Sequence, residues 1–215
     1  MQVRPVTPER LVEELAGRVL AAAAELERAH GPRAWLRVAV DGAPAARPAD
    51  LADALVDPVR VGGRAALRVS AEDFLRPASL RLERGREDPD AYLEDRLDDR
   101  ALAREVLDPL DPGGTGRWLP SLWDAQRDRA TRAAYAQAPP GAVLLLDGTA
   151  LLGRWLALDL VVHLALGPGA LARRTPPQLR WTLPALERYG AEVLPEEVAD
   201  VVVRVDDPRR PALVE

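Results

Sequence analysis

Apolar residues follow two different spacings along the chain, and their alternation predicts an α/β protein. Between residues 8 and 30 they recur every three or four positions, as on the buried face of an amphipathic helix. Thr7 can cap this helix and Pro8 suits its first turn, whereas Gly31 and Pro32 end it. Shorter apolar runs without that spacing predict buried strands. These runs cover residues 35–40, 66–70, 143–146, 158–166 and 200–205.

Helical and turn-rich segments separate these predicted strands. A short helix is expected over residues 48–55 and a charged one over residues 93–107, whereas residues 76–91 and 108–116 are rich in turn formers. Strands that alternate with helices form a mainly parallel sheet covered on both faces. Ligands of such sheets bind beyond the carboxyl ends of the strands. Three acids follow predicted strands closely and are expected at this edge, namely Asp41, Asp73 and Asp147.

Composition excludes several classes of protein. The net charge of −5, with arginine and acid interspersed, argues against a concentrated basic surface for nucleic acid. There is no cysteine, which excludes disulfides and thiolate metal sites. The two histidines are too few ligands for a histidine-based zinc site. The N-terminus lacks the pattern of a signal peptide, and charged residues interrupt the most apolar stretch, residues 150–172. We therefore expect a soluble, cytoplasmic protein that binds neither membrane nor nucleic acid, and we expect His163 to be a core histidine.

One loop has the layout of a phosphate-binding P-loop but lacks its characteristic residues. The motif is glycine, any four residues, then Gly-Lys-Ser or Gly-Lys-Thr, between a strand and a helix. Here Gly42 ends a strand, but Arg47, Pro48 and Ala49 stand at the last three motif positions. The chain has 29 arginines and no lysine. A general preference for arginine over lysine explains arginine where an exposed lysine is usual. It does not explain proline at the lysine position of the loop.

A series of short landmarks extends over most of the chain. They are Val-Ala-Val-Asp-Gly (38–42), Val-Ser-Ala-Glu-Asp-Phe-Leu-Arg-Pro (69–77), Arg-Gly-Arg (84–86), Asp-Pro-Asp-Ala-Tyr (88–92), Leu-Asp-Pro-Leu-Asp-Pro-Gly-Gly (107–114), Leu-Leu-Leu-Asp-Gly (144–148) and Ala-Asp-Val-Val-Val (199–203). In this order and spacing they resemble the uridine kinase-like branch of the P-loop kinases, especially its actinobacterial members. The resemblance implies a P-loop NTPase-like three-layer α/β sandwich with a mainly parallel sheet and a short helical lid.

The expected domain organisation follows from the helix prediction and from this resemblance. Residues 1–33 are expected to form an N-terminal helix packed on the core. Residues 34–215 are expected to form the P-loop kinase-like domain, with a lid region at about residues 168–190.

The resemblance also implies roles for residues on the acceptor side. Asp73 matches the acid that orients the acceptor hydroxyl or acts as its base, since phosphoryl transfer mainly requires positioning and charge neutralisation. Asp147 matches the acid that supports magnesium. Arg76 and Tyr92 are candidate substrate contacts, and Trp123 can line a pocket or simply pack in a loop. A capping or turn role is the alternative for both acids.

On the nucleotide side, the residues depart from the family pattern. Gly42 is retained, but Arg47 replaces a glycine whose flexibility lets the backbone curl around phosphate. Pro48 replaces the phosphate-binding lysine and removes an N–H group, although it suits a helix start. Ala49 replaces the hydroxyl that ligates magnesium. Arg47 can itself bind phosphate, but it restores neither the magnesium ligand nor the lost donor.

The lid is altered as well. Arg173 and Arg174 match lid arginines that clamp phosphates, but the Thr-Pro-Pro sequence at 175–177 should end a lid helix at once.

Three hypotheses of function follow from this pattern. The leading one is a pseudokinase-like binding protein, or a scaffold reused for another reaction, with a small-molecule ligand at the acceptor pocket. The alternative is an active small-molecule kinase, which would use ATP and magnesium with Arg47, Arg173 and Arg174 supplying positive charge. A third is a purely structural partner of another enzyme. The candidate macromolecular partners are a second copy of the chain, in a homodimer, or another protein.

Overall fold

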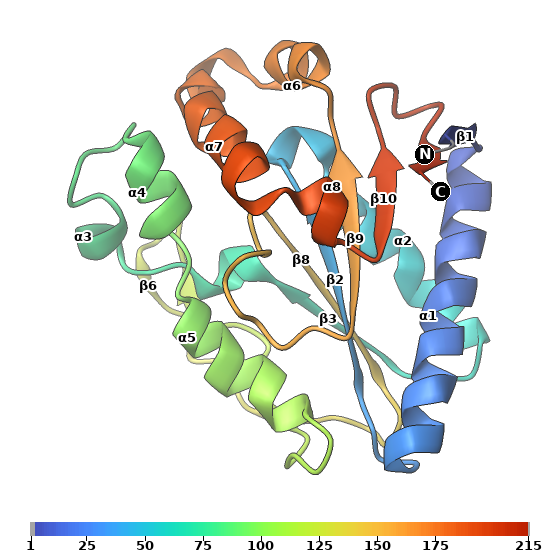
Figure 1. The fold of residues 1–215 in the computed structure, drawn as a ribbon. Helices are drawn as coiled ribbons and strands as arrows, with labels where there is room; N and C mark the ends of the chain where they lie inside the picture. Colours follow the sequence, from blue (N-terminus) through green and yellow to red (C-terminus); the bar gives the residue numbers. More distant parts are fainter. Residues whose placement is uncertain (1–2, 215) are drawn as a thin grey trace.

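The computed structural model describes residues 3–214, which form a three-layer α/β sandwich (Figure 1). A twisted sheet lies between two layers of helices, which confirms the predicted α/β class with a mainly parallel sheet. Seven strands form the sheet in the order β1-β11-β10-β9-β2-β8-β3. Their bounds are β1 Val3–Pro5, β2 Leu36–Gly42, β3 Ala66–Ser70, β8 Val143–Gly148, β9 Leu160–Ala165, β10 Val201–Arg204 and β11 Ala212–Val214.

The five strands β10, β9, β2, β8 and β3 are parallel, and β11 joins both β10 and β1 in antiparallel pairing. β2 is the first of the parallel strands in the chain but lies at their centre. The chain leaves it first towards β3 on one side and later towards β9 on the other. Such a change of direction opens a crevice at the carboxyl edge of a sheet, where ligands bind.

One face of the sheet is covered by two long helices, α1 (Pro8–His30) and α2 (Pro48–Val61). Helix α1 begins and ends as predicted, because the Thr7 side chain accepts from the Arg10 N–H at 3.2 Å and Gly31 caps the other end. Alternate strand residues such as Val38, Val40 and Leu145 face these helices and form one half of the core.

The other face is covered by shorter elements from the middle of the chain. The intervening strand residues, such as Ala39, Leu144 and Leu146, pack there against Leu102 and Leu107. The covering helices are α3 Ala78–Arg81, α4 Pro89–Glu94, α5 Asp99–Leu102, a π-helix Ala103–Leu107 and the 3-10 helices Ala71–Phe74 and Asp108–Leu110. Two pairs of short strands accompany them, β4 Arg117–Trp118 with β7 Ala136–Gln137 and β5 Trp123–Asp124 with β6 Arg129–Ala130.

The carboxyl edge of the sheet is roofed by helices from the C-terminal part of the chain (Figure 1, top). Helix α6 ends at Arg174, as the Thr-Pro-Pro sequence predicts, and a 3-10 helix and two further helices follow. Their bounds are α6 Pro168–Arg174, the 3-10 helix Pro177–Thr182, α7 Leu183–Val193 and α8 Pro195–Val198.

Several predicted boundaries were wrong. The helix expected over residues 93–107 is interrupted, because Leu97 pairs with Leu75 in an isolated bridge and Asp98 caps a new helix through the Ala101 N–H. Helix α2 continues to Val61, beyond the predicted end at residue 55, because its buried stripe continues to Val59. The terminal strands β1 and β11 were not predicted, since each has only three residues.

Within residues 3–214, no helix combines the length and the apolar character needed to cross a bilayer.

The packing of α1 predicts the effect of truncating one of its side chains. Leu15 is 1% exposed in the core between α1 and the sheet, so Leu15→Ala should lower the free energy of unfolding by about 2–5 kcal/mol in urea titrations. Leu80→Ala is the matched control, since Leu80 is 52% exposed and should change stability by less than about 0.5 kcal/mol. Equal effects of the two substitutions would show that α1 does not unfold together with the sheet.

Candidate functional site

A cavity of about 380 Å³ opens at the carboxyl edge of the sheet and is the candidate site. We call it the edge cavity. One wall is the loop between β2 and α2, and the floor is the end of β8 at Asp147 and Gly148. Glu72, Tyr92 and Arg96 line the side towards α4, whereas Thr175, Leu179 and Leu186 line the side towards α6 and α7.

The loop between β2 and α2 keeps the left-handed turn that the P-loop motif assigns to glycine. Arg47 has φ 62° and ψ 55°, a conformation that side chains other than glycine adopt at a cost of about 1 kcal/mol or more. Gly42 is required for a different reason. A Cβ there would lie 3.1 Å from the Leu164 Cβ, so the loop and β9 approach each other closely.

The same loop is poor in the N–H groups that hold a phosphate. Pro44 and Pro48 have no N–H group. The N–H of Ala46 donates to the Ala43 carbonyl at 2.8 Å, and the N–H of Arg47 donates to the Pro44 carbonyl at 3.0 Å, closing the 3-10 helix Pro44–Ala46. A phosphate-binding nest needs successive N–H groups that point outward to the anion. Four of the residues in this loop therefore cannot contribute to such a nest.

The carboxylate of Asp147 is ion-paired with an arginine of the adjacent strand. Asp147 is 3% exposed, and its Oδ1 lies 2.6 Å from the Arg68 Nη1. Its Oδ2 accepts from the Ser70 hydroxyl at 3.2 Å. Burial raises the pKa of Asp147, and the neighbouring Arg68 guanidinium acts in the opposite direction. The anion is thus neutralised by the chain itself.

Arg68 also reaches the first turn of α2. Its Nε donates to Asp53 at 2.7 Å, and its Nη2 donates to the Ala49 carbonyl at 3.3 Å. The guanidinium therefore spans from Asp147 to Ala49, the two positions from which the resemblance implies magnesium ligands. Ala49 has no ligating side chain, and a cation already lies beside Asp147. Within residues 3–214 no group of three or more acidic or histidine side chains is placed to hold a metal. These residues do not fit a magnesium ion.

Aromatic and charged side chains form the wall of the edge cavity towards α4. The Tyr92 ring meets the Trp181 ring edge-on, with centroids 5.5 Å apart, and the Arg96 guanidinium lies 4.9 Å from the Tyr92 centroid. Arg96 is also ion-paired with Glu72. Burial raises the pKa of the Tyr92 hydroxyl. Apolar contact and paired charge dominate this wall.

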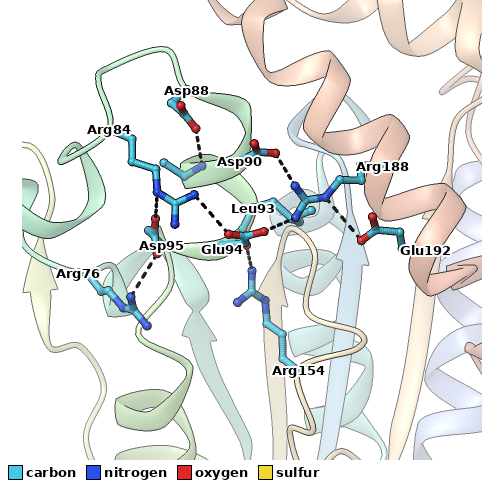
Figure 2. Close-up of polar contacts among 11 residues, drawn as sticks. Arg76, Arg84, Asp88, Asp90, Leu93, Glu94, Asp95, Arg154, Arg188 and Glu192 are labelled. Atoms are coloured by element: carbon cyan, nitrogen blue, oxygen red, sulfur yellow. Dashed lines mark hydrogen bonds and ion pairs between the residues drawn. The ribbon is translucent and has the colours of Figure 1, made fainter.

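An arginine network fastens α4 to α7 beside the edge cavity (Figure 2). Arg188 of α7 is bonded to Asp90 and, at 2.5 Å, to Glu94, both on α4. Its hydrogen bond lowers the pKa of Glu94. From the loop after β8, the partly buried Arg154 donates to the Leu93 carbonyl at the end of α4. The exposed pairs contribute little individually, but together they determine the spacing of the two helices.

Asp73 does not line the edge cavity, although it lies close enough to Asp147 for the charge of Asp147 to affect its pKa. It is half-buried in the 3-10 helix after β3. Its pKa is raised, mainly by burial and then by the negative charges of Asp147 and Glu72. Of the two neighbouring acids Glu72 and Asp73, Glu72 is the one that lines the edge cavity.

The other predicted site residues are dispersed. Arg47 lines the edge cavity, where it is ion-paired with Asp50, but Arg76 pairs with Asp95 outside it at 3.7 Å. Trp123 donates to Asp128 at 3.1 Å in the β5–β6 hairpin. The predicted phosphate clamp does not assemble at the cavity: the Arg173 side chain donates to the Gly169 carbonyl of its own helix, and the Arg174 side chain to the Val205 carbonyl. The edge cavity thus unites Arg47, Tyr92 and Asp147 of the predicted set.

A second carboxylate lies at the same edge but on the opposite face of the sheet. Asp41 is fully buried at the end of β2, and its carboxylate accepts three hydrogen bonds. The donors are the Leu151 N–H at 2.9 Å, the Tyr189 hydroxyl at 2.9 Å and the His163 Nδ1 at 2.7 Å. The predicted core histidine therefore has a specific partner, since His163 lies directly across from Asp41 on β9.

Sequence reasoning missed Arg68, Glu72 and Arg96. Arg68 carried a usable signal, because an arginine in the middle of the short apolar strand 66–70 requires an acidic partner nearby. Arg96 and Glu72 carried none, since their pairing depends on how two loops meet.

Comparison with solved structures identifies the fold. A possible uridine kinase from Bacillus stearothermophilus superposes with a TM-score of 0.66 and 18% identity, covering 88% of this chain and 98% of that one. A protein of Silicibacter sp. TM1040 assigned as a fructose transport system kinase gives 0.63 and 21%, covering 86% and 98%. The YGR205w protein gives 0.61 and 11%, covering 95% and 99%.

These likenesses establish a shared fold, as the sequence resemblance implies, and at such low identity they establish only that. No protein-family model matches the chain, and no curated protein sequence matches it.

The raised pKa of Asp73 predicts how stability depends on pH. The folded state holds the Asp73 proton more tightly than the unfolded state, because the pKa of this carboxyl is raised on folding. Asp73 therefore lowers the free energy of unfolding as the pH rises above the ordinary aspartate pKa of about 3.9. Asp73→Asn removes the charge and should make the protein more stable than wild type at about pH 7. The difference should shrink towards about pH 4 in urea unfolding.

Asp57→Asn is the control for Asp73→Asn, because the Asp57 side chain is 89% exposed and should show no such gain. A loss of stability at neutral pH in Asp73→Asn would mean that the ionised Asp73 makes a favourable contact.

Proposed function

We propose that this protein binds a small uncharged molecule in the edge cavity and does not carry out magnesium-ATP-dependent phosphoryl transfer. The observation that carries the proposal is the Arg68 guanidinium, which contacts both Asp147 and the Ala49 carbonyl. A bound magnesium ion would need Asp147 as a ligand or as support. With Arg68 in ion-pair contact, a divalent cation would have to displace a charge that is covalently part of the chain.

The phosphate loop supports the same proposal. Hydrogen bonds to a charged group contribute about 1.5–3 kcal/mol each, so a loop that loses several of its donors loses most of its affinity for phosphate. Pro44 and Pro48 lack the donor, and Ala46 and Arg47 use theirs within the loop. The side chain of Arg47 offers positive charge, but Asp50 neutralises it.

The charges that line the edge cavity indicate the class of ligand. Arg47 is paired with Asp50, Glu72 with Arg96, and Asp147 with Arg68. No net charge is left to attract an anion. The remaining walls are largely apolar, with Tyr92, Leu179 and Leu186 among them. A neutral ligand with a flat or apolar body fits this arrangement, and the uridine kinase-like fold makes an unphosphorylated nucleoside the first candidate.

The alternative function is an active small-molecule kinase with an unconventional phosphate loop. One observation favours it: Arg47 keeps the left-handed turn and lines both the edge cavity and an adjoining groove that Arg174 also lines. Under this alternative, ATP would be the phosphoryl donor and Asp73 would orient the acceptor. Two observations weigh against it: Arg174 donates to the Val205 carbonyl, and Arg173 is not among the residues that line the edge cavity.

Restoring the P-loop residues in two stages tests the proposal. The triple variant Arg47→Gly, Pro48→Lys, Ala49→Ser should gain no magnesium-dependent ATP binding while Arg68 remains. Adding Arg68→Val to it should create such binding, with a stabilisation of about 2.7 kcal/mol at 100 times the dissociation constant. Thermal unfolding with ATP, with and without magnesium, measures both, and circular dichroism verifies that each variant folds.

Wild-type protein provides the decisive comparison. It should show no magnesium-dependent shift with ATP but a metal-independent shift with uridine, which Tyr92→Ala should remove. A magnesium-dependent ATP shift in the wild type would overturn the proposal and favour the kinase alternative.

A further inference from the structure

A second concavity, separate from the edge cavity, lies between the end of β9 and the helices α7 and α8. It has a volume of about 430 Å³, and we call it the α7–α8 cleft. In Figure 1, α8 passes in front of the upper part of β9, and α7 leads to it from the left. Leu186 of α7 lines both concavities, so this helix separates them.

His163 is the polar side chain in the floor of the α7–α8 cleft. It is 7% exposed, and its Nδ1 is bonded to Asp41 at 2.7 Å. The Asp41 carboxylate is fully buried and also accepts from Tyr189 and Leu151, so it is surrounded by donors, as an ionised carboxylate requires. Its contact with Nδ1 therefore places a proton on that nitrogen.

This arrangement leaves Nε2 as the free nitrogen of His163. Within residues 3–214, Nε2 has no hydrogen-bond partner, and it is not sealed off from the surface as a buried unsatisfied atom would be. In the neutral ring with the proton on Nδ1, Nε2 is an acceptor. Because Nδ1 is directed to Asp41 on β2, the opposite edge of the ring is the one left for the cleft. The cleft thus has a nearly buried acceptor, oriented by a second residue and without a donor.

The rest of the lining defines the complementary ligand. Glu196 and Glu197 stand at the mouth, and no arginine is among the lining residues. Glu196 is ion-paired with Arg204 at 3.5 Å, whereas the Glu197 side chain has no partner within the described part of the chain. The walls are apolar, with Leu166, Leu171 and Leu194 among them. The cleft therefore has acidic side chains at its mouth, apolar walls and a hydrogen-bond acceptor, the His163 Nε2, in its floor.

We propose that the α7–α8 cleft binds a small organic ammonium ion, an amine on a short apolar body. The ammonium group would donate to the His163 Nε2, its charge would be stabilised by Glu197, and its apolar body would lie against the leucines. The orientation of Nε2 depends on Asp41, because the Asp41 carboxylate is hydrogen-bonded to the Nδ1 of the same ring. This proposal does not depend on the function proposed for the edge cavity, since the two share only α7.

Benzylamine is a suitable probe, with benzyl alcohol and benzoate as neutral and anionic analogues. Isothermal titration of the wild-type protein should show binding of benzylamine, weaker binding of the alcohol and none of benzoate. His163→Asn is the informative variant, because its amide nitrogen can still donate to Asp41 while Nε2 is lost. It should weaken benzylamine binding about tenfold or more, the loss expected for a hydrogen bond to a charged group.

Charge at the mouth is tested separately. Glu197→Gln should weaken benzylamine binding severalfold and leave benzyl alcohol unchanged. Glu25→Gln, on α1 and far exposed, is the matched control and should change neither. Tyr92→Ala, in the edge cavity, should also leave benzylamine affinity unchanged, which separates this proposal from the first.

Two results would overturn the proposal. One is the absence of benzylamine binding to the wild type at millimolar concentration. The other is unchanged benzylamine affinity in a His163→Asn variant whose circular dichroism spectrum shows that it is folded.

Discussion

The buried carboxylate of Asp41 holds together the edge of the sheet on which both concavities depend. A fully buried charge is costly unless several donors surround it. Asp41 obtains them from His163 on β9, Tyr189 on α7 and the Leu151 N–H in the loop after β8. These segments are far apart in sequence, so one carboxylate determines how the roof of the sheet sits on its strands. Through Tyr189 it also anchors the helix that separates the edge cavity from the α7–α8 cleft.

The pleat of the strands explains why the edge carries two distinct sites. Side chains alternate between the faces of a sheet, and Asp41 and Asp147 point to opposite faces even though both strands end at the same edge. On the face towards α2, Asp147 is neutralised by Arg68. On the other face, the Asp41 carboxylate accepts hydrogen bonds from Leu151, His163 and Tyr189. At the first site an arginine of the chain itself lies against the carboxylate, whereas at the second the carboxylate orients a histidine.

Much of the fold followed from local sequence signals. The cap at Thr7, the stripe of α1, the five parallel strands and the end of α6 before its two prolines all depend on neighbouring residues, and each is present. The interruption near Leu97 and the pairing of β1 with β11 depend on contacts with distant segments, which periodicity does not report.

The candidate site was less accessible to prediction than the fold. The resemblance singled out Arg47, Tyr92 and Asp147, which line one cavity, but the direction of the Arg68 side chain depends on packing across the sheet. For the two lid arginines, sequence position did not indicate where the side chains lie. Helix α6 ends at Arg174, before the two prolines. The Arg173 side chain is bonded to a backbone carbonyl of α6, and the Arg174 side chain to one in the segment after β10.

The pairing of β1 with β11 has a consequence for how the protein is made. Val3 is opposite Val214, so the two strands at one lateral edge of the sheet are the first and the last of its described strands to be synthesised. During translation, β1 stays unpaired until the residues up to Val214 have left the ribosome. Contacts of such high sequence separation form late and slow the approach to the native state. The final step of folding is therefore expected to be the closing of this edge, with the parallel core already in place.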